Sequence, residues 1–84
     1  MNNNTGEGYN FHTSQNKFIE NITKKRIHAY VDIYKNVFII WGLYEEDKDL
    51  LELALQKMGI KFITKNYRGD IGISINKEYL NIII

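Results

Sequence analysis

The residues best suited to acid–base chemistry are few, and their spacing is poor for it. His28 and Asp32 lie four residues apart. In a strand this places them on the same face but roughly 13 Å apart, too far for a direct histidine–carboxylate pair. Beyond the first sixteen residues, the hydroxyl nucleophiles are Thr23, Thr64 and Ser74, and no catalytic motif surrounds any of them. We therefore expect a protein that is not an enzyme.

Metal and phosphate chemistry also have little support. The chain has no cysteine and two histidines, His12 and His28, without the ligand spacing of a metal site. Gly69 and Gly72 do not form a phosphate-binding loop, because no helix is expected to follow them. We expect no metal and no cofactor.

The composition and the N-terminal sequence indicate in which compartment the protein is expected. The absence of cysteine fits a reducing compartment, and the start MNNNTGEGYNF lacks the basic and apolar stretches of a signal peptide. No apolar run approaches the length that spans a bilayer. We expect a cytoplasmic protein with no membrane contact. Nine lysines against two arginines, without proline, are typical of an AT-rich genome and hint at a low-GC bacterium or one of its mobile elements as the source.

The length of 84 residues and the net charge of +1 narrow the function classes. One small domain of this size is marginally stable, and without disulfides self-association is a common remedy. The balanced charge offers no broad basic field for nucleic acid. Any nucleic-acid contact must depend on local patches.

The N-terminal part divides into a tail and the start of the domain. Residues 1–16 are rich in asparagine and other polar residues, which predicts a flexible tail ahead of a single domain over 17–84. Phe18, Ile19 and Ile22 have helical spacing, which predicts a short helical turn.

About five strands and one main helix follow. Residues 26–34 alternate apolar and polar, Lys35-Asn36 is a turn, and 37–43 is an apolar returning strand. Four carboxylates at 45–49 open a helix that closes before Gly59, with Leu50, Leu51, Ala54, Leu55 and Met58 on its apolar face. Leu53 falls on the opposite flank of this helix.

The last third predicts a second hairpin and a final strand. Residues 60–67 and 70–76 flank a turn centred on Arg68-Gly69, and residues 78–84 end in three isoleucines. The fold class is α+β: a small, mostly antiparallel sheet of about five strands with one main helix packed on one face. The element order is β-β-α-β-β-β, after the short N-terminal helical turn.

The two-residue turns fix which side chains share a face. Tyr30 should oppose Trp41, Asp32 should oppose Ile39, and His28 should oppose Leu43. The face expected to meet the helix carries Ile27, Ala29, Val31, Ile33, Phe38, Ile40, Phe62, Thr64, Ile71, Ile73 and Ile75.

The second face has no cover that the sequence identifies. It carries His28, Tyr30, Tyr34, Val37, Ile39, Trp41, Ile63 and Tyr67, with Lys61 and Lys65 beside them. Three alternatives remain open: cover by the N-terminal segment or a curled sheet, contact with a protein, or stacking of nucleic-acid bases.

The leading hypothesis is a small non-enzymatic binding or regulatory protein that uses this aromatic face for a protein partner or for self-association. The alternative is a single-stranded nucleic-acid-binding protein that uses the aromatics and nearby lysines. The candidate binding residues are His28, Tyr30, Tyr34, Trp41, Tyr67, Lys61 and Lys65. The basic run Lys24-Lys25-Arg26 is expected to be a solvated edge.

Overall fold

The computed structural model describes residues 13–80 and confirms an α+β fold. Its elements, in chain order, are α1 (Thr13–Thr23), β1 (Tyr30–Ile33), β2 (Val37–Trp41), α2 (Glu45–Met58), β3 (Phe62–Tyr67), β4 (Asp70–Asn76) and the 3₁₀ helix η2 (Lys77–Tyr79). Within residues 13–80, no helix is long and apolar enough to cross a membrane.

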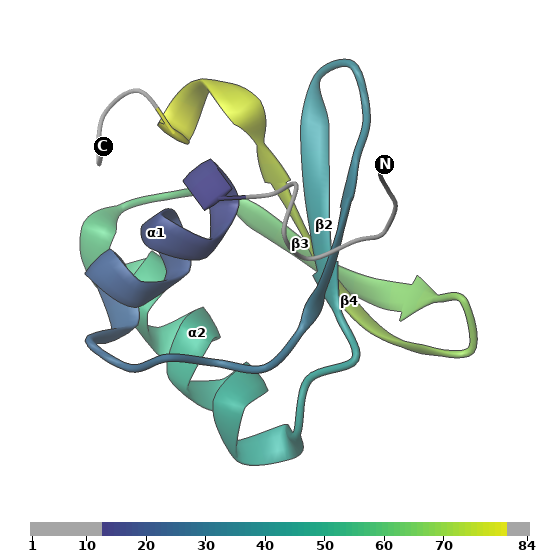
Figure 1. The fold of residues 1–84 in the computed structure, drawn as a ribbon, viewed down its shortest axis with the longest axis horizontal. Coiled ribbons are helices and arrows are strands. Elements are labelled where there is room, and N and C mark those ends of the chain that lie inside the picture. The colour runs from purple at the N-terminus through teal and green to yellow at the C-terminus, as the bar shows by residue number, and fades with distance from the viewer. Residues whose placement is uncertain (1–12, 81–84) are drawn as a thin grey trace.

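One antiparallel sheet joins the two hairpins in the order β1-β2-β4-β3 (Figure 1). The predicted registers are confirmed within the strands, since Tyr30 pairs with Trp41 and Tyr67 pairs with Asp70. Arg68 and Gly69 both have positive φ, of 54° and 79°, as the tight turn of a two-residue hairpin requires. The central strands β2 and β4 pair with each other and bring the two hairpins together.

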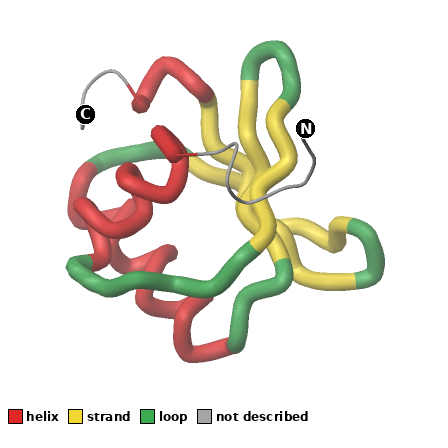
Figure 2. The backbone as a smooth tube through the Cα atoms, in the orientation of Figure 1, coloured by secondary structure: helices red, strands yellow, loops and turns green. Residues whose placement is uncertain are grey.

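Both helices pack on the same face of the sheet (Figure 2). Phe18 of α1 is fully buried, with its ring edge-on to Phe38 of β2 at a centroid distance of 5.6 Å. The short turn predicted here is a helix of 11 residues. Its first turn is polar, so apolar spacing gave no sign of it. Residues 1–12 of the predicted tail lie outside the described residues, whereas 13–16 belong to α1.

Helix α2 forms where it was predicted. Gly59 ends it in a left-handed conformation with φ of 73°, and the Ile60 amide donates to the Leu55 carbonyl. Leu51, Ala54 and Leu55 are buried as expected, and Leu50 is partly buried. Met58 was expected in the core but is 50% exposed, whereas Ile60, just beyond the helix end, is buried in the core. Leu53, on the opposite flank, is 48% exposed.

The first hairpin is shorter than predicted. Strand β1 begins at Tyr30, not at residue 26, and β2 ends at Trp41 because Gly42 takes a positive φ of 74°. The expected pair of His28 with Leu43 is therefore not formed. Leu43 leaves the sheet and packs against the core instead.

The chain turns helical where a final strand was predicted. The Asn76 side chain accepts a hydrogen bond from the Glu78 amide at 3.0 Å and so starts η2. Tyr79 and Leu80 pack against the core. Residues 81–84 of the predicted strand lie outside the described residues, and the sheet within 13–80 has four strands, not about five.

Candidate functional site: the outer face of the sheet

The outer face is the side of the sheet turned away from α1 and α2. Alternation along the paired strands places on it Tyr30, Asp32, Tyr34, Val37, Ile39, Trp41, Ile63, Lys65, Tyr67, Gly72 and Ser74. The buried residues of α1 pack against Phe38 and the other core residues on the opposite side. The first described helix therefore does not cover the outer face.

Trp41 is the centre of an aromatic cluster on this face. Tyr30 stacks on it from the neighbouring strand, with ring centroids 4.7 Å apart and planes 30° apart. Tyr67 meets it edge-on at 5.9 Å, and the Arg68 guanidinium lies 5.7 Å from the centroids of both rings. Contacts of this kind add cation–π attraction to burial. Tyr34 extends the cluster through an edge-on contact with Tyr67 at 6.5 Å.

Tyr67 crosses the outer face because Gly72 leaves room for it. A Cβ atom at Gly72 would lie 2.8 Å from Tyr67 Cβ and 3.1 Å from Ile39 Cγ2. The glycine thus lets a side chain from β3 lie over the central strands. The Tyr67 hydroxyl reaches Asp32 on β1 and donates to its Oδ2 at 2.6 Å. It also shares a short hydrogen bond with the Tyr34 hydroxyl.

Asp32 neutralises the charge that the cluster carries. The Arg68 Nε donates to Asp32 Oδ2 at 2.9 Å, so one carboxylate accepts from both an arginine and a tyrosine. Burial, followed by the hydrogen bonds to Asp32 and Tyr34, raises the pKa of Tyr67 to about 12. The pKa of Arg68 is also raised, through its interaction with Tyr67 and the charge of Asp32. The phenol therefore stays protonated at neutral pH.

The outer face is partly covered by its own side chains. Ile39 is only 3% exposed, and Trp41 and Tyr67 are half-buried. The indole Nε1 of Trp41 is buried and has no acceptor among the described residues. The apolar side chains that remain open to contact are Tyr30, Tyr34 and Ile63, at 59%, 47% and 65% exposure.

The two candidate lysines stand beside the aromatic cluster. Lys65 on β3 shares a sheet row with Gly72, Trp41 and Tyr30, and Lys61 immediately precedes β3. Both are exposed and form no ion pair with any residue in 13–80. Of the predicted set, the structure thus brings together the four aromatic residues Tyr30, Tyr34, Trp41 and Tyr67. Lys65 lies in the sheet row of Trp41 and Tyr30, and Lys61 lies just before the start of β3.

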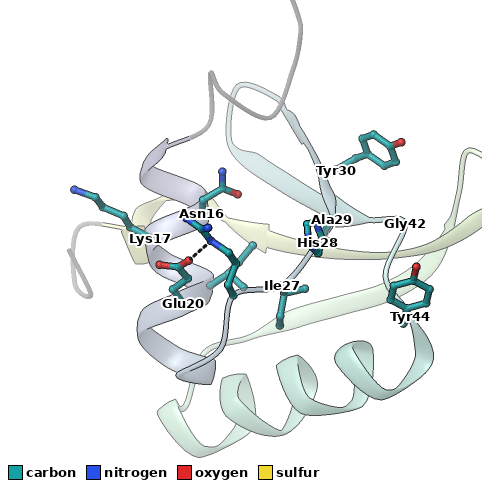
Figure 3. A pocket seen from close by; sticks show the side chains of 11 residues that line it. Asn16, Lys17, Glu20, Ile27, His28, Ala29, Tyr30, Gly42 and Tyr44 are labelled. Carbon is teal, nitrogen blue, oxygen red and sulfur yellow. Dashed lines mark hydrogen bonds and ion pairs between the residues drawn. The ribbon is translucent and has the colours of Figure 1, made fainter.

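His28 is the candidate that lies apart from the others. It precedes β1 and lines an open pocket of about 910 Å³ between α1 and the segment leading into the sheet (Figure 3). Glu20, a carboxylate in the same pocket, pairs with Arg26 at 3.2 Å. Asp32 is engaged on the outer face, so His28 and Asp32 do not form a unit.

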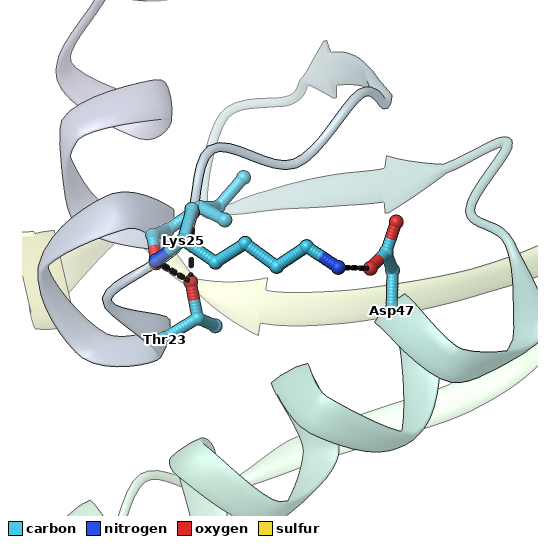
Figure 4. Close-up of polar contacts among 4 residues, drawn as sticks. Thr23, Lys25 and Asp47 are labelled. Atoms are coloured by element: carbon cyan, nitrogen blue, oxygen red, sulfur yellow. Dashed lines mark hydrogen bonds and ion pairs between the residues drawn. The ribbon is translucent and has the colours of Figure 1, made fainter.

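The basic run after α1 has a structural role at one of its residues. Lys25 Nζ lies 2.7 Å from Oδ1 of the buried Asp47 in the first turn of α2 (Figure 4). Thr23 holds the connection by donating to the Ile19 carbonyl at 2.7 Å and accepting from the Lys25 amide at 3.3 Å. Lys25 thus ties α1 to α2, although it was expected to be a solvated edge residue.

Sequence reasoning missed the polar half of the outer face. Arg68 was assigned to a turn and to a possible basic edge, and Asp32 was placed on this face opposite Ile39, but neither was expected to bind the other or Tyr67. The hairpin registers place each residue on a face, but only the pairing of β2 with β4 brings the two edge strands into line, and Gly72 then leaves room for Tyr67 to cross toward Asp32. The chain matches no protein-family model, no curated protein and no solved structure.

Proposed function

We propose that this chain is a small non-enzymatic binding protein that contacts another protein through the outer face. The observation that supports this most directly is that α1 and α2 both pack on the opposite face. Tyr30, Tyr34 and Ile63 are exposed on the same face as Trp41, and Tyr30 stacks on its ring. A small domain rarely exposes several large apolar side chains on one face unless that face takes part in an interaction.

The chemistry of the face favours a protein partner. Tryptophan, tyrosine and arginine are the residue types enriched at the centres of protein interfaces. Here Trp41, Tyr67 and Arg68 hold one another in place before any partner arrives. A preorganised cluster loses less side-chain entropy on binding than separate mobile residues do.

Site-specific photo-crosslinking in the producing cells tests the proposal. A benzophenone side chain at position 30 or 63 stands on the outer face, and one at Gln56 on the exposed side of α2 is the matched control. We expect protein adducts from Tyr30 and Ile63 and none from Gln56. Equal adducts from all three positions, or none from the outer face, would refute the proposal.

Light scattering over a concentration series tests whether the partner is a second copy. A mass that doubles with concentration, and returns to one chain in Tyr30→Ala, supports self-association through the outer face. Tyr30 is 59% exposed, so this variant is expected to fold. A mass of one chain throughout assigns the face to a different protein.

Binding of single-stranded nucleic acid is the second candidate, and the exposed Lys61 and Lys65 favour it. Bases would stack on the open rings of Tyr30 and Tyr34 while the lysines reach phosphates. Trp41 is less suited to this role, because Tyr30 and Arg68 already contact its ring. Binding of a labelled oligothymidine, measured by fluorescence anisotropy and weakening steeply with salt, is the expected signature. No binding at low salt would rule this candidate out.

A further inference from the structure

Strand β3 is an edge of the sheet. In the part of the chain that the structure describes, β4 is its only strand neighbour, and its backbone forms no other hydrogen bond. Its six residues, Phe62–Tyr67, are exposed except at the two half-buried ends. An edge of this length is a template for one more strand, since its outward amides and carbonyls have no backbone partner within residues 13–80.

The outer-face side chains along this edge have a symmetric pattern. Lys61, Ile63 and Lys65 alternate along it, so an exposed apolar residue lies between two exposed cations. Residues two apart on a strand are roughly 6.5 Å apart. A neighbouring strand would match Lys61, Ile63 and Lys65 if it had an apolar residue with one carboxylate two residues before it and another two residues after it. Because this pattern is symmetric, it matches in both parallel and antiparallel pairing.

We propose that β3 takes up an extended acidic segment of a partner protein as a fifth strand. In this arrangement the two carboxylates of the segment pair with Lys61 and Lys65, and its apolar residue packs on Ile63. The inference rests on the proposed function, namely that a protein contacts the outer face, and it names the edge and the chemistry of that contact. Backbone hydrogen bonds supply affinity, and the row of side chains supplies selectivity.

The same row disfavours pairing of β3 with a second copy of itself. In the antiparallel register that sets Ile63 opposite its own copy, each Lys61 faces a Lys65. Like charges directly opposite one another destabilise a strand pair. The other edge strand is a poorer site for an acidic segment, because β1 has only four residues and carries Asp32 on the outer face.

A labelled peptide tests the proposal on the intact chain. The probe is acetyl-Thr-Glu-Thr-Val-Thr-Glu-Thr-amide, and the charge control replaces both glutamates with lysine. Fluorescence anisotropy should show the glutamate peptide binding about tenfold more tightly than the lysine peptide, as two favourable cross-strand charge pairs predict. Two further probes carry N-methyl groups on one or the other set of alternate amides. One of these two should lose binding, because one set of amides faces β3.

Charge reversal in the protein completes the test. Lys61→Glu with Lys65→Glu should invert the preference toward the lysine peptide, whereas Lys17→Glu with Lys57→Glu, which has the same net charge, should keep the original preference. Lys17 and Lys57 are exposed on α1 and α2. Circular dichroism of both double variants verifies that the fold is retained.

Three results would overturn the proposal. The first is equal binding of the glutamate and lysine peptides, and the second is full binding of both N-methylated probes. The third is tighter binding of an oligothymidine of about ten nucleotides than of the peptide, with the same dependence on Lys61 and Lys65. That result would make nucleic acid the occupant of the edge. If the peptide fails while adducts at positions 30 and 63 persist, the edge-strand proposal is refuted and the proposed function stands.

Discussion

Tyr67 and Asp32 join the two edge strands of the sheet by a hydrogen bond of 2.6 Å. Tyr67 belongs to β3 and Asp32 to β1, with both central strands between them. This hydrogen bond anchors the Tyr67 hydroxyl to β1, the edge strand opposite β3. It thereby fixes the position of the tyrosine side chain beside Gly72 and Ile39. Much of the order of the outer face therefore depends on a single phenol.

Replacing this phenol should loosen the cluster without unfolding the protein. Tyr67→Phe keeps the ring and removes the donor to Asp32, which remains paired with Arg68. We expect a loss of about 1 kcal/mol in the free energy of unfolding, measured by urea denaturation. Tyr44→Phe is the matched control, because Tyr44 is 72% exposed, and it should change stability by less than about 0.5 kcal/mol. Equal effects of the two variants would contradict the role assigned to the bond.

The raised pKa of Tyr67 predicts a dependence of stability on alkaline pH. The pKa is about 12 in the folded chain against 10.0 for an unperturbed tyrosine, so folding favours the protonated phenol. Its contribution to stability is complete below pH 10 and is lost as the pH rises toward 12. Urea denaturation across this range should show a steeper decline for the unaltered chain than for Tyr67→Phe. Parallel declines would show that Tyr67 titrates normally.

Gly72 should tolerate no side chain. In Gly72→Ala the new Cβ would meet Tyr67 Cβ at 2.8 Å and Ile39 Cγ2 at 3.1 Å, and neither atom is the end of a flexible side chain. We expect a loss of about 1–3 kcal/mol from overpacking, together with a changed near-ultraviolet circular dichroism of Trp41 and the tyrosines. An unchanged spectrum at full stability would show that Tyr67 does not cross the face at this residue.

Helix α1 should be essential for folding. Phe18 is fully buried in the core, and its ring meets that of Phe38 edge-on. Phe18→Ala should cost about 3–5 kcal/mol, most of the stability of a domain this small. Its exposed neighbour Lys17 provides the control, since Lys17→Ala should stay within about 0.5 kcal/mol. A mild effect of Phe18→Ala in thermal unfolding would mean that α1 is dispensable.

The contact between α1 and α2 gives a second comparison of matched variants. Lys25→Met leaves the buried carboxylate of Asp47 without its cation, whereas Arg26→Met removes a pair in which the arginine side chain is 86% exposed. We expect Lys25→Met to lower the urea midpoint clearly and Arg26→Met to leave it nearly unchanged. The reverse order would contradict the structural role of Lys25.

Local sequence patterns were sufficient where the chain pairs with its near neighbours. The two hairpin registers follow from Lys35-Asn36 and Arg68-Gly69, because a two-residue turn leaves one way to align its strands. The end of α2 follows from Gly59. These features depend on a few adjacent residues, and the same registers separate the core face from the outer face.

Local patterns were insufficient where a distant contact decides. The first turn of α1 is polar, and the helix is held by Phe18 against Phe38 on another element. The end of β2 depends on the positive φ of Gly42, and η2 depends on one side-chain cap at Asn76. The link from Tyr67 to Asp32 requires the strand order, which hairpin registers alone do not determine.

The central pairing of β2 with β4 has a consequence for how the chain folds. Each hairpin closes over a turn of two residues. Strands β2 and β4, by contrast, are separated in the chain by α2 and β3, and their pairing joins residues as distant as Val37 and Asn76. Closing a long loop costs more entropy than closing a short one. The two hairpins should therefore form first, and their docking across β2 and β4 should limit the folding rate. The aromatic cluster, with members on both hairpins, would then be assembled only in that last step.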